Sequence, residues 1–295
     1  MKPENPLHLT TQKCTTGCPI LDRFLAGGIP CNSITELVAE SGCGKTQLCL
    51  QLVLSAQLPI SQGGLAASSL YFYSEFPFPF RRLQQLSSSF SSSHPDLFST
   101  HDPCDHIFVR GLQSADELLG LLDRIDTFLT NPPSRLPVKL IVIDSVAALF
   151  RSEFENTPGD LKRRSSLFFG IAGKLKLRAK RFGLAIVITN QVVDLIGSDT
   201  ANGVRVGNLS CLYSSGRRVC SALGLSWANC INSRLFLSRV DEIAGKETAV
   251  KDDEGGNSVL VCTRRRMHVV FAPHLPESSC EFVIVREGVF GLDER

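Results

Sequence analysis

Short apolar runs alternate with longer helix-like stretches through the first two thirds of the chain. The runs predict buried strands at residues 34–38, 70–73, 107–109, 140–143 and 184–189. The stretches between them predict helices at residues 46–58, 80–90, 114–129 and 160–182, after a shorter helix within 14–25. Wholly apolar strands that alternate with helices are typical of a parallel sheet covered on both faces. We therefore expect an α/β fold with a mostly parallel central sheet flanked by helices.

The pattern changes after Gln191. A polar stretch rich in Gly and Ser runs to about residue 222, and short strands without long helices follow at 234–239, 259–263, 268–271 and 282–286. We expect these strands to be antiparallel additions at the C-terminal end of the sheet. Residues 1–12 are polar and contain two prolines, which predicts a flexible tail before a single core at 13–295. Residues 87–93 and 249–257 show no apolar periodicity and are expected to be surface loops.

Composition narrows the class of protein. No apolar run reaches the roughly 18 residues that a membrane span needs, and the N-terminus lacks the features of a signal peptide. The formal net charge is only +2, so a nucleic-acid surface would have to come from local clusters of Lys and Arg. The 11 cysteines include no C-x-x-C pair, and most lie in apolar runs, which indicates buried thiols in a reduced cytosolic or nuclear protein.

The strongest chemical signal is the octapeptide at residues 39–46. It reads Ala39, Glu40, Ser41, Gly42, Cys43, Gly44, Lys45 and Thr46, which is the P-loop pattern with Ala in place of the usual first Gly. Two glycines let successive backbone N–H groups point inward at phosphate oxygens. Lys45 would reach the β- and γ-phosphates, and the Thr46 hydroxyl would bind Mg²⁺. The motif lies between a predicted strand and a predicted helix, which favours nucleotide binding over the alternative of a Gly-rich turn.

Three polar residues end other predicted strands. Asp144 would help to position Mg²⁺, with helix capping as the alternative. Glu75 could polarise the water that attacks the γ-phosphate, or could be an ordinary surface glutamate. Gln191 could sense the γ-phosphate through its amide, or could belong to a polar turn.

Taken in their order along the chain, the P-loop, Glu75, Asp144 and Gln191 resemble the core of the RecA/RadA recombinase family. The resemblance rests on the P-loop with Gln47 after Thr46, on Glu75, on Asp144-Ser145 and on the segment 189–192. The segments 14–22, 27–29 and 33–37 are similar to the family's approach to its P-loop, and 80–86, 144–148, 222–229 and 272–280 are similar to eukaryotic paralogues of the recombinase. The resemblance covers the chain from about residue 14 to its end. It implies a RecA-like P-loop ATPase core that binds ATP with Mg²⁺.

The resemblance also implies a function. The family acts in homologous recombination repair of DNA, here expected for double-strand breaks and crosslinks. The chain would then be a weak DNA-dependent ATPase in a heteromeric complex, located in the nucleus, with the cytoplasm as the alternative. The expected partners are other RecA-family paralogues, especially the C-type paralogue, together with the main recombinase and single-stranded or branched DNA. No membrane partner is expected.

The family contacts DNA through two loops, and their positions are carried over from the resemblance. The first corresponds to residues near 151–164 and holds Arg151, Phe154, Lys162, Arg163 and Arg164; the second lies between 193 and 222 and holds Arg205, Arg217 and Arg218. Basic side chains would bind phosphates, and the aromatic ring could pack against bases. Solvated charge is the alternative for both clusters, and Lys162–Arg164 could instead belong to the beginning of a surface helix, because residues 160–161 are typical of a helix start. Arg82 matches the family's adenine-stacking arginine.

The sequence departs from the family in three places. Ala39 replaces glycine, which is tolerated if its φ stays negative. Phe76-Pro77 follows Glu75 where recombinases have small residues, which puts fast hydrolysis in doubt. The chain starts just before the ATPase core, so the N-terminal helical domain, the Phe-x-x-Ala linker and a filament of identical subunits are all expected to be absent. Residues 169–172 read Phe-Gly-Ile-Ala, but they lie inside a predicted helix and are expected to be buried in the protein core.

Two other functions stay open. An assembly module would bind partner paralogues in an ATP-switched manner with negligible hydrolysis, which Phe76-Pro77 favours. A small-molecule P-loop kinase would share the motif, but the sequence shows no Arg-rich lid segment after its middle strands, and sharing a P-loop is only a fold-level analogy.

Overall fold

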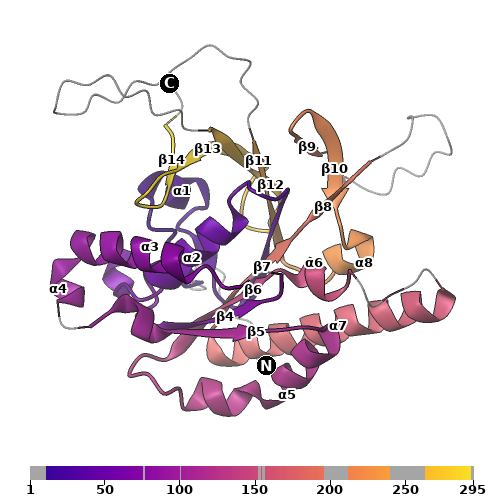
Figure 1. Cartoon of the computed structure of the whole chain (residues 1–295), viewed down its shortest axis with the longest axis horizontal. Coiled ribbons are helices and arrows are strands. Elements are labelled where there is room, and N and C mark those ends of the chain that lie inside the picture. The colour runs from indigo at the N-terminus through magenta and orange to yellow at the C-terminus, as the bar shows by residue number, and fades with distance from the viewer. Residues whose placement is uncertain are drawn as a thin grey trace, which may run out of the picture.

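Among the residues that the structure describes, nine strands form one central sheet (Figure 1). The computed structural model describes residues 11–75, 77–99, 101–151, 154, 157–195, 212–239 and 263–293. The strand order is β14-β13-β12-β11-β3-β7-β6-β4-β5. The strands from β11 to β5 are parallel to one another, and β12, β13 and β14 extend the sheet antiparallel. The expected mostly parallel sheet with antiparallel strands near the C-terminus is confirmed.

The elements alternate along the chain much as the apolar pattern predicts. The strands of the central sheet are β3 (Ser33–Ala39), β4 (Ser68–Tyr73), β5 (Ile107–Gly111), β6 (Val138–Asp144), β7 (Ala185–Asn190), β11 (Ser233–Arg239), β12 (Arg265–Phe271), β13 (Ser279–Ile284) and β14 (Val289–Gly291). The helices are α1 (Pro19–Phe24), α2 (Lys45–Ser55), α3 (Phe80–Ser93), α4 (Pro95–Phe98), α5 (Ala115–Thr130), α6 (Val146–Leu149), α7 (Pro158–Phe182) and α8 (Gly224–Ala228). Two short strands, β1 (Lys13–Cys14) and β2 (Ile29–Pro30), pair with each other.

Both faces of the sheet are covered, because side chains in a strand alternate between its faces. Leu140 and Val142 of β6 belong to a core shared with α2 and α3, whereas Ile141 and Ile143 belong to a core shared with α5 and α7. Figure 1 shows α2 and α3 on one face of the sheet and α5 and α7 on the other. Among the described residues, no helix has the length and apolarity needed to cross a membrane.

One strand runs opposite to its predicted direction. The segment 234–239 was expected to be antiparallel, but β11 lies parallel to β3 with Leu235 opposite Leu37. After β7 the chain forms a small antiparallel sheet and α8, and it then returns between β3 and β12 in the same direction as β7. The predicted strand at 259–263 lies outside the described residues except for Thr263, as does the predicted tail up to residue 10.

The serine-rich segment 87–93 is helical, contrary to the loop that its composition predicts. It forms the second half of α3, in which Leu86 and Ser87 are buried. Ser88, Ser89, Ser92 and Ser93 each donate a hydroxyl hydrogen bond to the carbonyl four residues earlier. These bonds satisfy the hydroxyls inside the helix, and burial of the apolar side outweighs the low helix propensity of serine.

A three-stranded antiparallel sheet follows β7. It contains β8 (Val192–Asp194), β9 (Leu212–Ser214) and β10 (Arg217–Ser221), in the order β8-β10-β9. Its tight turn is Ser215-Gly216, where both residues have positive φ, as hairpin turns of this length require. The polar stretch expected to be a loop is therefore strand at both ends, and its middle, residues 196–211, lies outside the described residues.

Candidate nucleotide and nucleic-acid site

The P-loop has the backbone shape that its glycines predict. It joins β3, which is hydrogen-bonded on both sides, to the first residue of α2. Gly42 and Gly44 have φ of +78° and +106°, and a Cβ on Gly44 would lie 2.6 Å from Ile284 Cδ1. No side chain caps α2, so its first N–H groups remain for an anion. Ala39 is absent from the residues with positive φ, which confirms that alanine fits at the first position.

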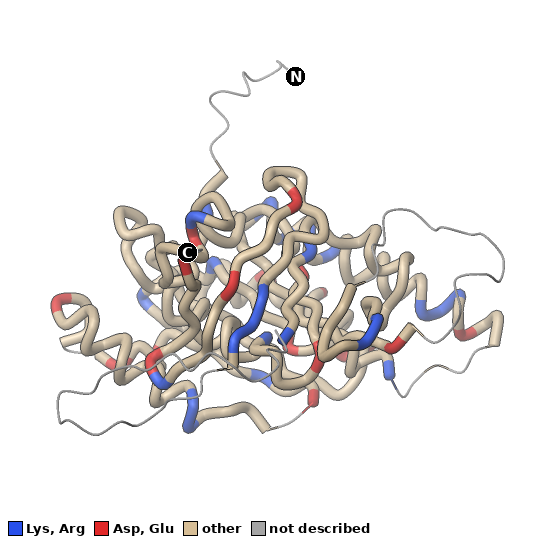
Figure 2. Tube along the Cα trace, turned by 90° about the horizontal axis from the view of Figure 1, so that it is seen from above, with Lys and Arg blue, Asp and Glu red and all other residues tan. Residues whose placement is uncertain are grey.

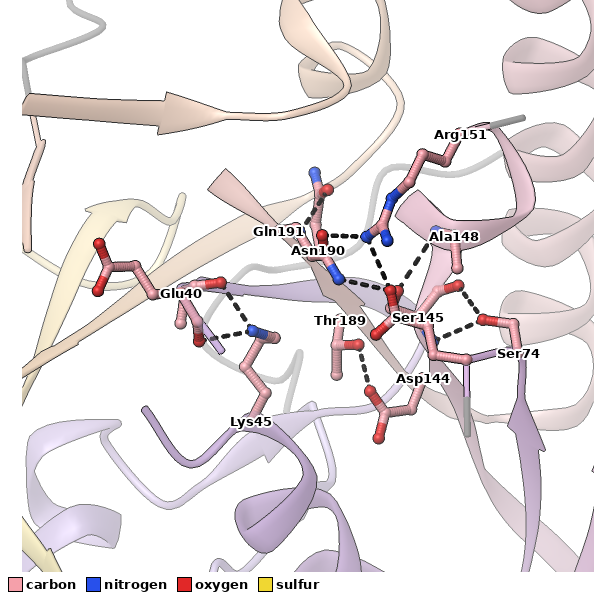
Figure 3. Close-up of polar contacts among 12 residues, drawn as sticks. Glu40, Lys45, Ser74, Asp144, Ser145, Ala148, Arg151, Thr189, Asn190 and Gln191 are labelled. Carbon is pink, nitrogen blue, oxygen red and sulfur yellow. Dashed lines mark hydrogen bonds and ion pairs between the residues drawn. The ribbon is translucent and has the colours of Figure 1, made fainter. Parts of the chain in front are cut away.

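Lys45 lies partly buried under the loop. Its ammonium donates to the carbonyls of Ala39 and Glu40 at 2.7 and 2.9 Å (Figure 3). Burial lowers the pKa of Lys45, and the charge of Asp144 offsets part of this effect. A phosphate group in the loop would relieve the desolvated ammonium, because charge-assisted hydrogen bonds are stronger than bonds to carbonyls.

Asp144 gathers three hydroxyl donors from three elements. Thr46 of α2 and Tyr71 of β4 donate to its Oδ2 at 2.7 and 2.6 Å, and Thr189 of β7 donates to its Oδ1 at 2.6 Å. In the described part of the chain no three His, Cys, Asp or Glu residues converge on a metal. A threonine hydroxyl beside one carboxylate nevertheless fits Mg²⁺, which binds nucleotide sites through one or two protein oxygens plus phosphates and water. The helix-capping alternative is wrong for Asp144, because Ser145 caps α6.

A cleft of about 1170 Å³ joins these residues to the predicted adenine side. It is lined by Ser41, Gly42, Gly44, Lys45, Thr46, Gln47, Glu75, Arg82, Asp144, Gln191, Thr263, Arg265, Ile284, Val285, Arg286 and Glu287. Arg82 donates to Gln47, to the carbonyl of Val285 and to the carbonyl of Arg286, each at 2.7 Å. These bonds engage the edge of the guanidinium and fix its plane, and stacking on a base uses the face.

Glu75, Gln191 and Arg151 form a cluster at the end of the cleft. The Oε1 of Glu75 accepts hydrogen bonds from Arg151 Nη2 at 2.9 Å and from Gln191 Nε2 at 2.5 Å. Arg151 also donates to Gln191 (Figure 3). The fold thus brings Glu75, the predicted base, next to Gln191, the predicted phosphate sensor. Arg151, which was expected to contact DNA, lies with them. Phe76, which raised doubt about Glu75, lies outside the described residues.

The second half of the first predicted DNA loop is helix, which agrees with the surface helix expected as the alternative. Thr157 caps α7, which begins at Pro158, so Lys162, Arg163 and Arg164 lie in its first turns. Arg163 pairs with Asp116 at 2.5 Å and lies 5.5 Å from the centre of the Phe154 ring. Phe154 in turn stacks on Phe150 with ring centres 5.7 Å apart, so its ring packs inward. In the view of Figure 2, the positions of basic and acidic residues are intermixed along the described part of the trace.

The second predicted DNA loop is connected to the P-loop. Arg217 pairs with Glu40 at 2.6 Å and with Asp194 at 3.1 Å, and the Ser215 hydroxyl donates to Glu40 at 2.8 Å. Burial acts to raise the pKa of Glu40, but the bonds from Ser215 and Arg217 outweigh it and hold this pKa below its ordinary value. Arg217 is therefore bonded to the P-loop through Glu40. Arg218 lies beside it on β10, and Arg205 lies outside the described residues.

Sequence reasoning missed a buried charge pair behind the P-loop. Glu36 and Arg234 are 0% and 1% exposed, with Oε2 and Nε 2.5 Å apart. The other oxygen of Glu36 accepts from Asn190 and from Trp227, both at 2.8 Å. Asn190 also donates to Ser221 at 2.8 Å, which links β3, β7, β10, α8 and β11 in one network. A charged residue within the apolar run 34–38 was the signal available in the sequence.

Phe169, expected in the core, is 58% exposed on α7, whereas Ala172 is buried at 3%. The helix turns by about 100° per residue, so Phe169 and Ala172 lie about 60° apart around its axis. The buried side of α7 includes Ala172 but not Phe169. The Phe-Gly-Ile-Ala spelling is thus part of an amphipathic helix.

The fold and the cleft define a RecA-like P-loop protein. The Rad51 family profile matches residues 9–207, and the chain belongs to this family. It is 60% identical over 294 residues to the DNA repair protein XRCC3 homolog of Arabidopsis thaliana, an alignment that covers 98% of this chain and 97% of that protein. It is 33% identical to DNA repair protein XRCC3 of Mus musculus, covering 95% and 76%, and 32% identical to DNA repair protein RAD51 homolog 2 of Mus musculus, covering 82% and 70%.

Proposed function

We propose that this protein is an ATP-binding member of the Rad51 family that acts in homologous recombination repair of DNA breaks and crosslinks, within a complex of recombinase paralogues in the nucleus. The observation that carries the proposal is the convergence of Lys45, Thr46, Glu75, Asp144 and Gln191 on one cleft. Relatives that are named as DNA repair proteins align over nearly the whole chain, which supports the biological role.

The residues of the cleft suit ATP as a substrate. Lys45 would exchange its two carbonyl partners for phosphate oxygens. The N–H groups of the first turn of α2 would donate to the same phosphate group. Thr46 and Asp144 would hold Mg²⁺, which when bound neutralises charge on the phosphates. Glu75 would polarise a water molecule and accept its proton as the water oxygen bonds to the γ-phosphorus. The bond between that phosphorus and the bridging oxygen would break, so that ADP leaves and phosphate is the second product. Gln191, which shares a hydrogen bond with Glu75, would report whether the γ-phosphate is present.

A second candidate is an assembly module that binds ATP and partner paralogues with negligible hydrolysis. It is favoured by the state of Glu75, whose Oε1 accepts bonds from both Arg151 and Gln191. A carboxylate held in this way is poorly placed to act on water. The two candidates differ in whether turnover is needed, not in whether ATP binds.

The test is co-purification with Rad51-family paralogues, followed by nucleotide and DNA assays on the complex. We expect ATP to strengthen partner binding, single-stranded DNA to bind at low salt, and Lys45→Ala to abolish the effect of ATP. Glu75→Gln separates the two candidates, because it removes turnover but leaves ATP binding intact. Loss of repair in cells with partner binding preserved would exclude the module, and no affinity for DNA in any nucleotide state would exclude direct DNA binding.

A further inference from the structure

Arg151 lies at the end of α6, two residues beyond Leu149, and it reaches the tip of β4. Its Nη2 donates both to Glu75 Oε1, at 2.9 Å, and to Gln191. Gln191 donates in turn to the same carboxylate oxygen at 2.5 Å. Each of the three side chains therefore hydrogen-bonds to the other two. Glu75, the candidate base, is held by the positive charge of Arg151.

This arrangement opposes the chemistry that Glu75 would perform. Polarising water requires a carboxylate oxygen directed at the water, with its negative charge uncompensated. Here the Oε1 of Glu75 accepts two hydrogen bonds, and the guanidinium compensates its charge. In this arrangement, Oε1 of Glu75 is therefore engaged by Arg151 and Gln191 and is not directed at a water molecule.

The Arg151 side chain is the accessible member of the pair. The Arg151 side chain is 60% exposed and the Glu75 side chain 23%, so an anion from solution can approach the guanidinium without entering the cleft. A guanidinium matches a phosphate diester well, through two parallel N–H bonds to two oxygens. The exposed ion pair with Glu75 is a weak competitor, because solvent screens it.

We propose that Arg151 is a positioning residue that restrains Glu75, and that a phosphate of a bound single-stranded DNA backbone competes for Arg151 and releases the carboxylate. The proposal rests on the proposed function, since it takes DNA as the ligand and Glu75 as the base. Such a release would couple occupation of the DNA surface to ATP turnover in one step. It also assigns Arg151 two alternating partners, the protein's own carboxylate and the phosphate.

The test measures competition directly, without ATP turnover. If Glu75 and DNA compete for Arg151, then Glu75→Gln must tighten DNA binding by the nucleotide-free protein. We expect the affinity for a fluorescein-labelled single-stranded oligothymidylate to rise about three- to fivefold at low salt, the size of an exposed ion pair. Arg151→Gln should weaken binding and lower the slope of log affinity against log salt by about 0.7, the contribution of one phosphate on single strands.

Two further variants separate competition from general charge effects. Glu117→Gln removes the same charge from a glutamate that pairs with Arg110 at 3.5 Å, and glutamine still accepts the bond from the Gln113 N–H. It should leave DNA affinity within about 1.5-fold of wild type, as expected for one screened surface charge. In the double variant Glu75→Gln, Arg151→Gln the gain from Glu75→Gln should vanish.

The outcomes separate this inference from the proposed function. If the wild type binds the oligonucleotide but Glu75→Gln leaves the affinity unchanged, or tightens it no more than Glu117→Gln does, the inference is wrong and the proposed function stands. If the gain persists in the Arg151→Gln background, Glu75 acts on DNA by another route, and the inference is again wrong. If the wild type binds no oligonucleotide at low salt, DNA binding is refuted and the inference falls with it.

Discussion

Replacing Glu36 with glutamine tests the buried charge pair that joins the P-loop strand to its neighbours. Glutamine keeps the shape of the side chain, and its Oε1 can still accept from Trp227 and Asn190 at the present 2.8 Å. What it removes is the negative charge 2.5 Å from Arg234 Nε. The substitution therefore isolates the electrostatic part of the network from its packing.

The cost follows from the burial of Arg234. With a side chain 1% exposed, its guanidinium has no access to water that could replace Glu36. Among the described residues its Nη2 has no hydrogen-bond partner, and the Phe271 ring, 5.4 Å away, offers only a cation–π contact. Breaking one side of a buried ion pair costs about 3–5 kcal/mol. We expect a loss of this size in the free energy of unfolding, with a melting temperature lower by on the order of 10 °C.

The assay uses the only tryptophan of the chain, Trp227, whose indole donates to Glu36. Its fluorescence in urea reports unfolding of the network itself. Glu117→Gln serves as the surface control and should shift the midpoint little. The double variant Glu36→Gln, Arg234→Met should recover most of the loss, because no buried charge is left unpaired. A loss below about 1 kcal/mol for Glu36→Gln would show that the pair is not desolvated as argued.

Three further predictions concern the P-loop. Lys45→Ala should weaken the affinity for Mg²⁺·ATP about 10- to 100-fold in calorimetry, with an unchanged circular dichroism spectrum, because it removes the charged donor; wild-type affinity would contradict the assignment. Glu40→Gln should cost at most about 1 kcal/mol at pH 7, since Arg217 is 55% exposed. Because the pKa of Glu40 is lowered in the folded state, its contribution is present above the ordinary glutamate pKa, and the difference between variant and wild type should shrink as the pH falls below about 4; a constant difference down to pH 3 would refute this. Gly44→Ala should lower the free energy of unfolding by about 1–3 kcal/mol, as expected for a residue with φ of +106°. In the same urea titration, Gly173→Ala should stabilise α7 slightly, because its Cβ would meet nothing within 4 Å. Equal effects of the two substitutions would show that the loop can relax.

The pattern of apolar residues predicted the sheet well because burial on both faces leaves a direct trace in the sequence. Strands β3, β4, β5, β6 and β7 all fall on predicted apolar runs. The errors lie where local pattern and tertiary burial conflict. The serines of α3 read as a loop, but Leu83 and Leu86 bury one side of the helix. The direction of β11 depends on where the chain returns to the sheet, which no local period encodes.

The residues of the site were predictable from the sequence, but the hydrogen bonds between them were not. The P-loop spacing determines its backbone shape, because only glycine tolerates the φ values of Gly42 and Gly44. Asp144 was predictable as the residue that ends a buried strand, but its hydroxyl donors Tyr71 and Thr189 were not. They lie 73 and 45 residues away in sequence, and only the pairing of β4, β6 and β7 brings them to the carboxylate.

The sequence by itself determined the class of protein, an α/β core of the Rad51 family with a P-loop motif, because that class requires particular residues at fixed local spacing. Only the tertiary structure decided how the charges are paired. Arg151 and Arg217 read as free DNA contacts along the chain, yet the fold brings them against Glu75 and Glu40. The physical reason is that an ion pair depends on distance in space, whereas a motif depends on distance along the chain.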